Sequence, residues 1–236
     1  MLRSCSNRAP IAAAVLALAA AGGPARAGEA SRELAPEFNA FVKLSDRSRL
    51  YLLADVSHTS PDDSSVGELG VHLDYTLVPI ARAELREADW ARNRYLWVRV
   101  GYREIDSIDG RAEPSREHRL QFEGVARFEL PRAFWLEQRA RLDLRDINGS
   151  GSQRYMVHTS IERELLISGT TVVPYVSAEF YYDKRFNAWS RQRYQVGAEI
   201  ELNKSWRIEP YVAHDADKYP AASGVNRLGL ALKYYR

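Results

Sequence analysis

Residues 191–212 carry the pattern that most restricts the folds open to this chain. Tyr194 and Val196 belong to an apolar series that alternates with polar or small residues. A polar break at Asn203 follows, and the alternation resumes at Trp206. Successive side chains of a strand point to opposite faces, so this stretch predicts a β-hairpin with one apolar and one charged face.

The same alternation recurs along the rest of the chain. Residues 79–92 interrupt it with helix-forming residues, which predict a short helix or a long turn there. We identify eleven strand-like segments: 35–44, 47–57, 66–77, 94–103, 118–129, 133–146, 154–165, 171–182, 191–202, 206–212 and 226–235. Bacterial outer-membrane barrels have an even number of strands. We therefore predict an all-β fold, an antiparallel up-and-down transmembrane β-barrel of about 12 strands, with 10 as the alternative.

The connections between these segments alternate in length. Bacterial barrels have short periplasmic turns and longer outer loops, so the alternation predicts that the C-terminus lies in the periplasm. The short turns are at 45–46, 130–132, 168–169 and 203–204, and the longer polar loops at 58–65, 104–114, 147–152, 183–187 and 215–223.

The first residues have the three-part layout of a secretory signal peptide. Residues 1–10 contain two arginines and no acid, residues 11–21 are apolar, and residues 25–27 form a small-x-small cleavage site. The apolar run is about half the ~20 residues that a spanning helix needs. We expect a cleaved signal peptide over 1–27 and an outer-membrane β-barrel domain over 28–236.

Charge and cysteine content narrow the functional classes. Removing residues 1–27 takes away three arginines and no acid, so the formal charge moves from +2 to −1. Basic and acidic residues alternate along the remainder, so we expect no nucleic-acid partner. The single cysteine, Cys5, lies in the predicted signal peptide, which leaves no disulfide. The 13 Tyr, 5 Trp and 7 Phe suit the aromatic girdle of a membrane barrel.

The polar faces of the predicted strands are rich in arginine and carboxylate. In a narrow barrel such side chains interlock and fill the lumen, and in a wider one they line an aqueous path. We favour a structural ion-pair core, with a narrow channel that prefers anions as the open alternative. The predicted lumen-lining residues are Arg99, Arg103, Arg119, Glu123, Arg127, Glu137, Arg139, Arg141, Asp143, Arg145, Glu199, Glu201, Arg207 and Glu209.

One short motif raises the question of enzymatic activity. His158 and Ser160 share a strand face about 7 Å apart, and Glu162 follows on the same side. A histidine can act as the base for a serine nucleophile in lipid hydrolysis. However, the strand pattern places Val157 and Ile161 towards lipid, so the histidine and serine are predicted to face the lumen. We expect no enzymatic activity, no metal site and no cofactor.

The chain resembles an uncharacterised family of bacterial outer-membrane β-barrels, of the domain-of-unknown-function 2490 type. The features that match are the turn before a tryptophan at residues 202–206 and the closing segment at 226–235. The resemblance implies a barrel in the outer membrane and supplies no catalytic residues.

These patterns together predict an exported, porin-like, monomeric barrel in the outer membrane of a Gram-negative bacterium. Its expected role is that of a structural barrel or a narrow channel with an Arg/Glu-rich lumen. The expected partners are outer-membrane lipid, lipopolysaccharide and, during insertion, the barrel-assembly machinery. Two alternatives stay open: an outer-membrane lipid-modifying hydrolase, and a soluble periplasmic β-sandwich that binds ligands.

Overall fold

The computed structural model describes five stretches of the chain: 31–60, 63–77, 96–108, 115–219 and 223–236. The predicted signal peptide (1–27) and the predicted helix or turn (79–92) lie outside the described residues. Strands make up nearly all of the described chain: β1 (Ser31–Lys43), β2 (Ser48–Ser60), β3 (Ser64–Thr76), β4 (Leu96–Ser107), β5 (Arg116–Leu130), β6 (Phe134–Ile147), β7 (Ser150–Arg163), β8 (Leu165–Ile167), β9 (Thr170–Asp183), β10 (Ala188–Glu201), β11 (Trp206–Asp217) and β12 (Ser223–Tyr235).

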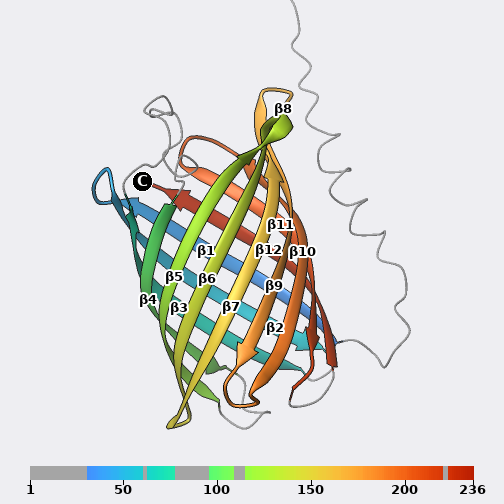
Figure 1. Ribbon diagram of the computed structural model, residues 1–236. Coiled ribbons are helices and arrows are strands. Elements are labelled where there is room, and N and C mark those ends of the chain that lie inside the picture. Colours follow the sequence, from blue (N-terminus) through green and yellow to red (C-terminus); the bar gives the residue numbers. More distant parts are fainter. Residues whose placement is uncertain (1–30, 61–62, 78–95, 109–114, 220–222) are drawn as a thin grey trace, which may run out of the picture. The chain divides into compact units, whose positions relative to one another are not determined.

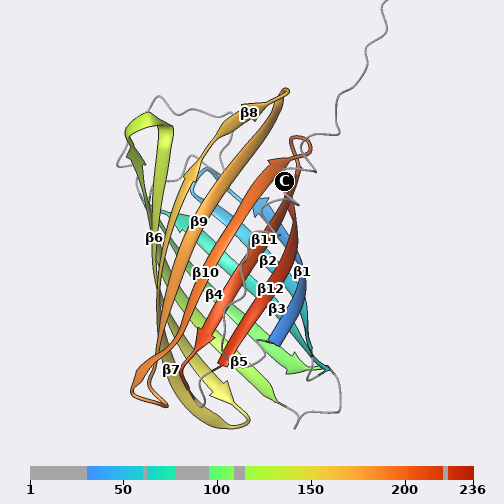
Figure 2. The same cartoon turned by 90° about the vertical axis from the view of Figure 1, so that its right-hand side faces the viewer.

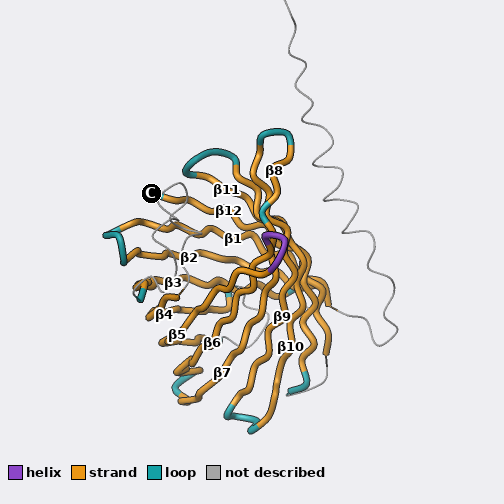
Figure 3. Tube along the Cα trace, turned by 45° about the horizontal axis from the view of Figure 1, so that its top comes forward, coloured by secondary structure: helices purple, strands orange, loops and turns teal. Residues whose placement is uncertain are grey.

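These strands form one sheet that closes on itself into a barrel (Figures 1 and 3). Sequential neighbours pair antiparallel around the wall, with β7 pairing to β9. The predicted all-β barrel of about 12 strands is confirmed, with eleven strands in the wall and β8 outside it. The β-sandwich alternative is wrong, because a sandwich requires two stacked sheets and these strands form a single closed one.

The short strand β8 continues β7 past an interruption. Glu162 of β7 lies opposite Tyr175, and Leu165 of β8 lies opposite Val172, so both strands share one register against β9. Pro174 of β9 lies at the interruption and has no backbone N–H to give to the ladder. The strand that pairs with β9 is therefore divided into β7 and β8, and the tip of this hairpin projects beyond the rest of the wall (Figure 1).

The barrel closes through a parallel pair. An odd number of strands that alternate in direction must bring two strands of the same direction together, and here these are β1 and β12 (Figure 2). Both run from the end of the barrel that holds Ser31, named the N-end, to the end that holds Arg236, named the C-end. Hydrogen bonds from Lys43 N to Arg236 O (2.7 Å) and from Arg236 N to Phe41 O (2.9 Å) extend this seam.

The connecting turns follow from their residues. Asn148 and Gly149 both have positive φ, at 51° and 83°, as the two-residue type I′ hairpin requires. At the β10–β11 turn, the Asn203 side chain accepts hydrogen bonds from the backbone N–H groups of Ser205 (2.9 Å) and Trp206 (3.1 Å). This local bonding fixes the turn without a glycine.

The N-end connections are shorter than predicted. Strands extend through most of the polar stretches that the sequence marks as loops, which leaves 61–63, 108–115, 148–149, 184–187 and 218–222 between strands. A polar segment can still be part of a strand, because the neighbouring strands bond to its backbone even beyond the apolar part of the wall. Because the difference in loop length between the two ends largely disappears, the predicted periplasmic position of the C-terminus stays a prediction. In the described chain no helix is long and apolar enough to cross a membrane.

Candidate functional site

The two faces of the barrel wall have opposite chemistry. On β5, the inward side chains of Arg119, Gln121 and Glu123 are 7%, 1% and 5% exposed. Between them, Leu120 and Phe122 point outward and are 39% and 40% exposed. A water-soluble protein buries its apolar residues and exposes its charged ones. This barrel does the reverse, so its chemistry lies inside.

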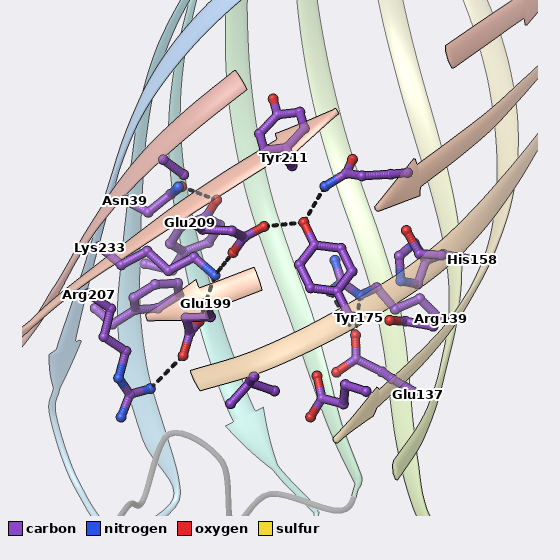
Figure 4. Close-up of a pocket in the computed structure, with 18 of the residues that line it drawn as sticks. Asn39, Glu137, Arg139, His158, Tyr175, Glu199, Arg207, Glu209, Tyr211 and Lys233 are labelled. Carbon is purple, nitrogen blue, oxygen red and sulfur yellow. Dashed lines mark hydrogen bonds and ion pairs between the residues drawn. The ribbon is translucent and has the colours of Figure 1, made fainter. Parts of the chain in front are cut away.

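The larger interior space lies towards the C-end and has a volume of about 350 Å³ (Figure 4). We name it the C-end cavity. Its lining includes seven carboxylates and seven basic side chains, so its formal charge balances. These are Glu37, Glu123, Glu137, Glu162, Glu179, Glu199 and Glu209, with Arg49, Arg99, Arg127, Arg139, Arg193, Arg207 and Lys233.

A second space of about 260 Å³ lies towards the N-end, and we name it the N-end cavity. Its lining carries five arginines against three carboxylates, a surplus of two positive charges. The lining residues are Glu117, Arg119, Arg145, Arg154, Asp183, Arg185, Phe186, Ser190, Arg191, Asp217 and Tyr219.

A layer of buried side chains lies between the two cavities on the side of the barrel formed by β3 to β9. Along β5, β6, β7 and β9, the inward positions between the two linings include Gln121, Asp143, Met156 and Tyr181, none more than 6% exposed, and Arg141, whose side chain is 11% exposed. The Gln121 amide donates to Asp143 Oδ1 (2.9 Å), and its oxygen lies 3.1 Å from His72 Nε2. We name Gln121, Asp143, Met156, Tyr181 and His72 the septum. These side chains occupy part of the space between the two cavities.

Interior hydrogen bonds and ion pairs connect strands that are not neighbours. Tyr175 of β9 donates to Glu209 Oε1 of β11 (2.6 Å), and Lys233 Nζ of β12 lies 2.8 Å from Glu199 Oε2 of β10 (Figure 4). Each pair reaches over one intervening strand. Because a charge in low dielectric is costly unless it is paired, these contacts decide which strands fit beside one another.

Asp74 of β3 is among the most deeply buried of these charges and, like Asp143, is 0% exposed. Arg49 Nε lies 2.5 Å from one carboxylate oxygen, and Arg99 Nε lies 2.6 Å from the other. The adjoining strands β2 and β4 supply the two arginines. This triad fixes three consecutive strands through charge-assisted hydrogen bonds.

A row of stacked rings crosses the parallel seam. Phe41 of β1 stacks on Tyr235 of β12 at 4.8 Å and on Tyr51 of β2 at 4.7 Å. Guanidinium groups cover the ends of the row, with Arg207 4.5 Å from the Tyr235 ring and Arg99 4.4 Å from the Tyr51 ring. Offset stacking and cation–π contacts thus reinforce the one pair of strands that the up-and-down order leaves parallel.

Glycines on the inner face make room for these rings. A Cβ at Gly101 would lie 1.9 Å from the His72 ring, and one at Gly229 would lie 2.0 Å from the Tyr211 ring. Each glycine pairs directly with its aromatic neighbour on the next strand. The rings therefore lie flat against the wall, an arrangement that only a missing side chain permits.

The predicted motif of His158, Ser160 and Glu162 faces the C-end cavity. His158 Nδ1 lies 3.1 Å from Glu179 Oε1, whereas Glu162 forms an ion pair with Arg127. The carboxylate that orients the histidine is thus Glu179 on β9, because direct pairing across strands places it closer than a residue four positions along the same strand. No hydrogen bond joins the histidine to the serine among the described residues.

All the predicted lumen-lining residues except Glu201 divide between the two cavities and the layer between them. Arg103 pairs with Glu68, and Arg141 Nε lies 2.9 Å from Asp143. Glu201 is half-buried and lines neither cavity. Arg119 and Arg145 line the N-end cavity; the C-end cavity holds Arg99, Glu123, Arg127, Glu137, Arg139, Glu199, Arg207 and Glu209.

Several interior residues were not among the predicted ones. The strand alternation already places them on polar faces, but their partners depend on register between distant strands. They are Asp74, Tyr175, Glu179, Asp183, Asp215 and Lys233. No group of three or more His, Cys, Asp or Glu side chains suited to a metal ion occurs in the part of the chain that the structure describes.

Comparison with solved structures finds similar chains at low sequence identity. No family model matches the chain, and no curated protein matches it. One similar structure is the beta domain of the Bordetella autotransporter BrkA, with 14% identity over 77% of this chain and 82% of that chain and a TM-score of 0.47. Another is LpxR from Salmonella typhimurium, with 8% identity over 80% and 83% and a TM-score of 0.45. Neither similarity says what this chain does, and the family resemblance stays a prediction.

Proposed function

We propose that the chain is a monomeric outer-membrane β-barrel of a Gram-negative bacterium, with a closed interior and a structural role. The exposed apolar belt supports a lipid environment, since closed barrels are the only sheets that span membranes. Aromatic clusters flank this belt at both ends. Trp206 packs on Tyr234 (4.8 Å) near the C-end, and Tyr182 packs on Trp189 (5.7 Å) near the N-end.

The spacing of these clusters suits a bilayer. Trp206 pairs with Leu202 at the β10–β11 turn, and Trp189 begins the same strand β10 near the N-end. At about 3.3 Å per residue, the strand between Trp189 and Leu202 spans roughly 43 Å, or about 30 Å along the membrane normal at a tilt of about 45°. This matches the hydrocarbon thickness of about 30 Å.

Cysteine labelling tests this placement, because the one native cysteine lies in the predicted signal peptide. In membranes containing the folded protein, V157C should react with a lipid-soluble maleimide and resist a membrane-impermeant one. The matched control is L166C, at the 77% exposed tip of β8, which should react with both reagents. Equal reaction of V157C with the impermeant reagent would place the belt in water and overturn the proposal.

The septum is the observation that carries the closed interior. We expect liposomes that contain the wild-type barrel to be impermeable to small sugars in a swelling assay. Replacing both Met156 and Tyr181 by Ala removes the two largest side chains of the septum and should make the liposomes permeable. S160A, which alters the C-end cavity away from the septum, is the matched control and should stay impermeable. Free permeation through the wild type would instead support the narrow channel.

No observation in the described structure favours the lipid-modifying hydrolase. The His158 and Ser160 side chains face the interior, away from lipid, and are 8% and 6% exposed. S160A should therefore leave any lipid hydrolysis by the folded protein unchanged. Loss of hydrolysis in this variant would reinstate the enzyme.

A further inference from the structure

The N-end cavity is built differently from its C-end counterpart. Its five arginines outnumber its three carboxylates, and water screens charge poorly around the two that are buried, Arg119 and Arg145, which are each 7% exposed. An interior that only needed ion pairs to hold the wall would balance its charges, as the C-end cavity does. The surplus of positive charge in the N-end cavity favours the binding of an anion.

The inner arginines of this cavity are held in place by carboxylates without using all their donors. Arg119 donates to Glu117 through Nε (2.8 Å), which leaves its terminal nitrogens for a ligand. Arg154 uses Nε (3.2 Å) and one terminal nitrogen (3.0 Å) on Asp143, a septum carboxylate outside the cavity lining. An arginine presents five N–H donors in a fixed fork, so one partner seldom satisfies it.

The outer part of the cavity exposes two more guanidinium groups. The Arg185 side chain is 39% exposed and the Arg191 side chain 37% exposed, against 6% for Arg145 deeper inside. Asp183 lies 2.8 Å from Arg185, and Asp217 lies 2.5 Å from Arg191. Each carboxylate thus holds one edge of a guanidinium group and fixes its orientation. Oriented and accessible guanidinium groups are the usual recognition element for phosphate.

An aromatic pair lies beside these arginines. Phe186 and Tyr219 stack at 5.5 Å with an interplanar angle of 16°, and both line the N-end cavity. Arg185 lies 5.1 Å from the Phe186 ring. Tyr219 remains 45% exposed. The mouth therefore offers a flat apolar surface next to a cationic one.

We propose that the N-end cavity binds a phosphorylated saccharide. The phosphoryl oxygens accept hydrogen bonds from the guanidinium groups of Arg119, Arg185 and Arg191, and the sugar ring packs on the Phe186–Tyr219 pair. A phosphate monoester carries about −1.5 to −2 charges at neutral pH, which offsets the surplus of two. The inference goes beyond the closed structural barrel, because such a site does not depend on whether the interior conducts.

Titration calorimetry on the folded full chain in detergent tests the site, with glucose 6-phosphate, inorganic phosphate and glucose as probes. Glucose 6-phosphate should bind most tightly, phosphate more weakly, and glucose undetectably. The double variant R185A/R191A should weaken both phosphorylated probes by about tenfold or more, since two charge-assisted contacts are lost. R47A/R132A removes two exposed C-end arginines as the matched control and should bind as the wild type does.

F186A separates the two halves of the site. It should lower the affinity for glucose 6-phosphate to that for phosphate and leave phosphate binding unchanged. The proposal is overturned if neither phosphorylated probe binds the wild type, if R185A/R191A binds them equally well, or if glucose binds as tightly as its phosphate. Heat-dependent gel mobility confirms that each variant is folded before titration.

Two sources could supply this chemistry, a membrane glycolipid and a free sugar phosphate. Competition by lipopolysaccharide against bound glucose 6-phosphate, lost when the lipopolysaccharide is dephosphorylated, would support the site with a membrane glycolipid as its ligand. Binding of glucose 6-phosphate without such competition would support the site with a free sugar phosphate.

Discussion

The outer and inner faces of the barrel wall are specified in different ways. Outward positions such as Leu120 and Val157 need only be apolar, because lipid makes no directional demand. Inward positions carry named partners on particular strands, as Asp74 does with Arg49 and Arg99. The outer face is thus fixed by composition, whereas the inner face is fixed by register. Changes on the two faces should differ accordingly.

The largest effect is expected at the buried triad. D74A leaves two guanidinium groups buried without their carboxylate and should lower the free energy of unfolding by about 3–5 kcal/mol. Urea unfolding of the detergent-folded barrel measures this. The control is D46A at the exposed β1–β2 turn, where Lys43 lies 2.9 Å away and its hydrogen bond lowers the pKa of the Asp46 carboxyl. Equal unfolding midpoints for the two variants would contradict a register held by interior charge.

The outer face should resist charge but tolerate apolar change. V157R puts a guanidinium group in the lipid-facing belt and should cost about 2–4 kcal/mol of unfolding free energy in a bilayer. L166R, at the tip of β8 beyond the wall, should cost much less. Unfolding titrations in lipid vesicles compare the two. If V157R were as harmless as L166R, the belt would not lie in lipid.

Two glycines on the adjoining strands β4 and β5 allow a direct comparison of the inner and outer faces of the wall. Gly101 points inward against the His72 ring, whereas a Cβ at Gly124 on the outer side would meet nothing within 4 Å. G101A should therefore cost about 1–3 kcal/mol through overpacking, and G124A should be close to neutral. Thermal unfolding of both variants decides this. A neutral G101A would mean that the ring is not held against the wall.

The smallest effect is expected from a polar pair on the outer face. Thr159 Oγ1 donates to Gln138 Oε1 (3.0 Å) across β6 and β7. Replacing both partners together by apolar residues (T159V with Q138L) should change the unfolding free energy by less than about 1 kcal/mol, since no group is left unpaired. Urea titration of the double variant checks this. A loss as large as that of D74A would show that the outer face also depends on specific partners.

The sequence predicts the faces of the strands well, because side-chain alternation is local. The eleven segments found by alternation correspond to the eleven wall strands, and Arg119 and Leu120 lie on the faces that their positions indicate. Closure is not local. Nothing in the segments 35–44 and 226–235 alone indicates that they pair in parallel, since that follows from the count and direction of every strand between them.

The interior was predictable only in part, for the same reason. Alternation identifies which residues face inward, including Arg99 and Glu137, but it cannot say which of them meet. The partner of His158 is Glu179, twenty-one positions away, because β7 and β9 pair in that register. The septum and the unequal charges of the two cavities likewise depend on how all the strands are staggered.

Single-channel recording of the folded wild-type protein in a planar bilayer tests the closed interior most directly. With the septum intact, we predict a silent bilayer in 1 M salt, and discrete steps once Met156 and Tyr181 are both replaced by Ala. Regular steps from the wild type would contradict the closed barrel and show a conducting lumen.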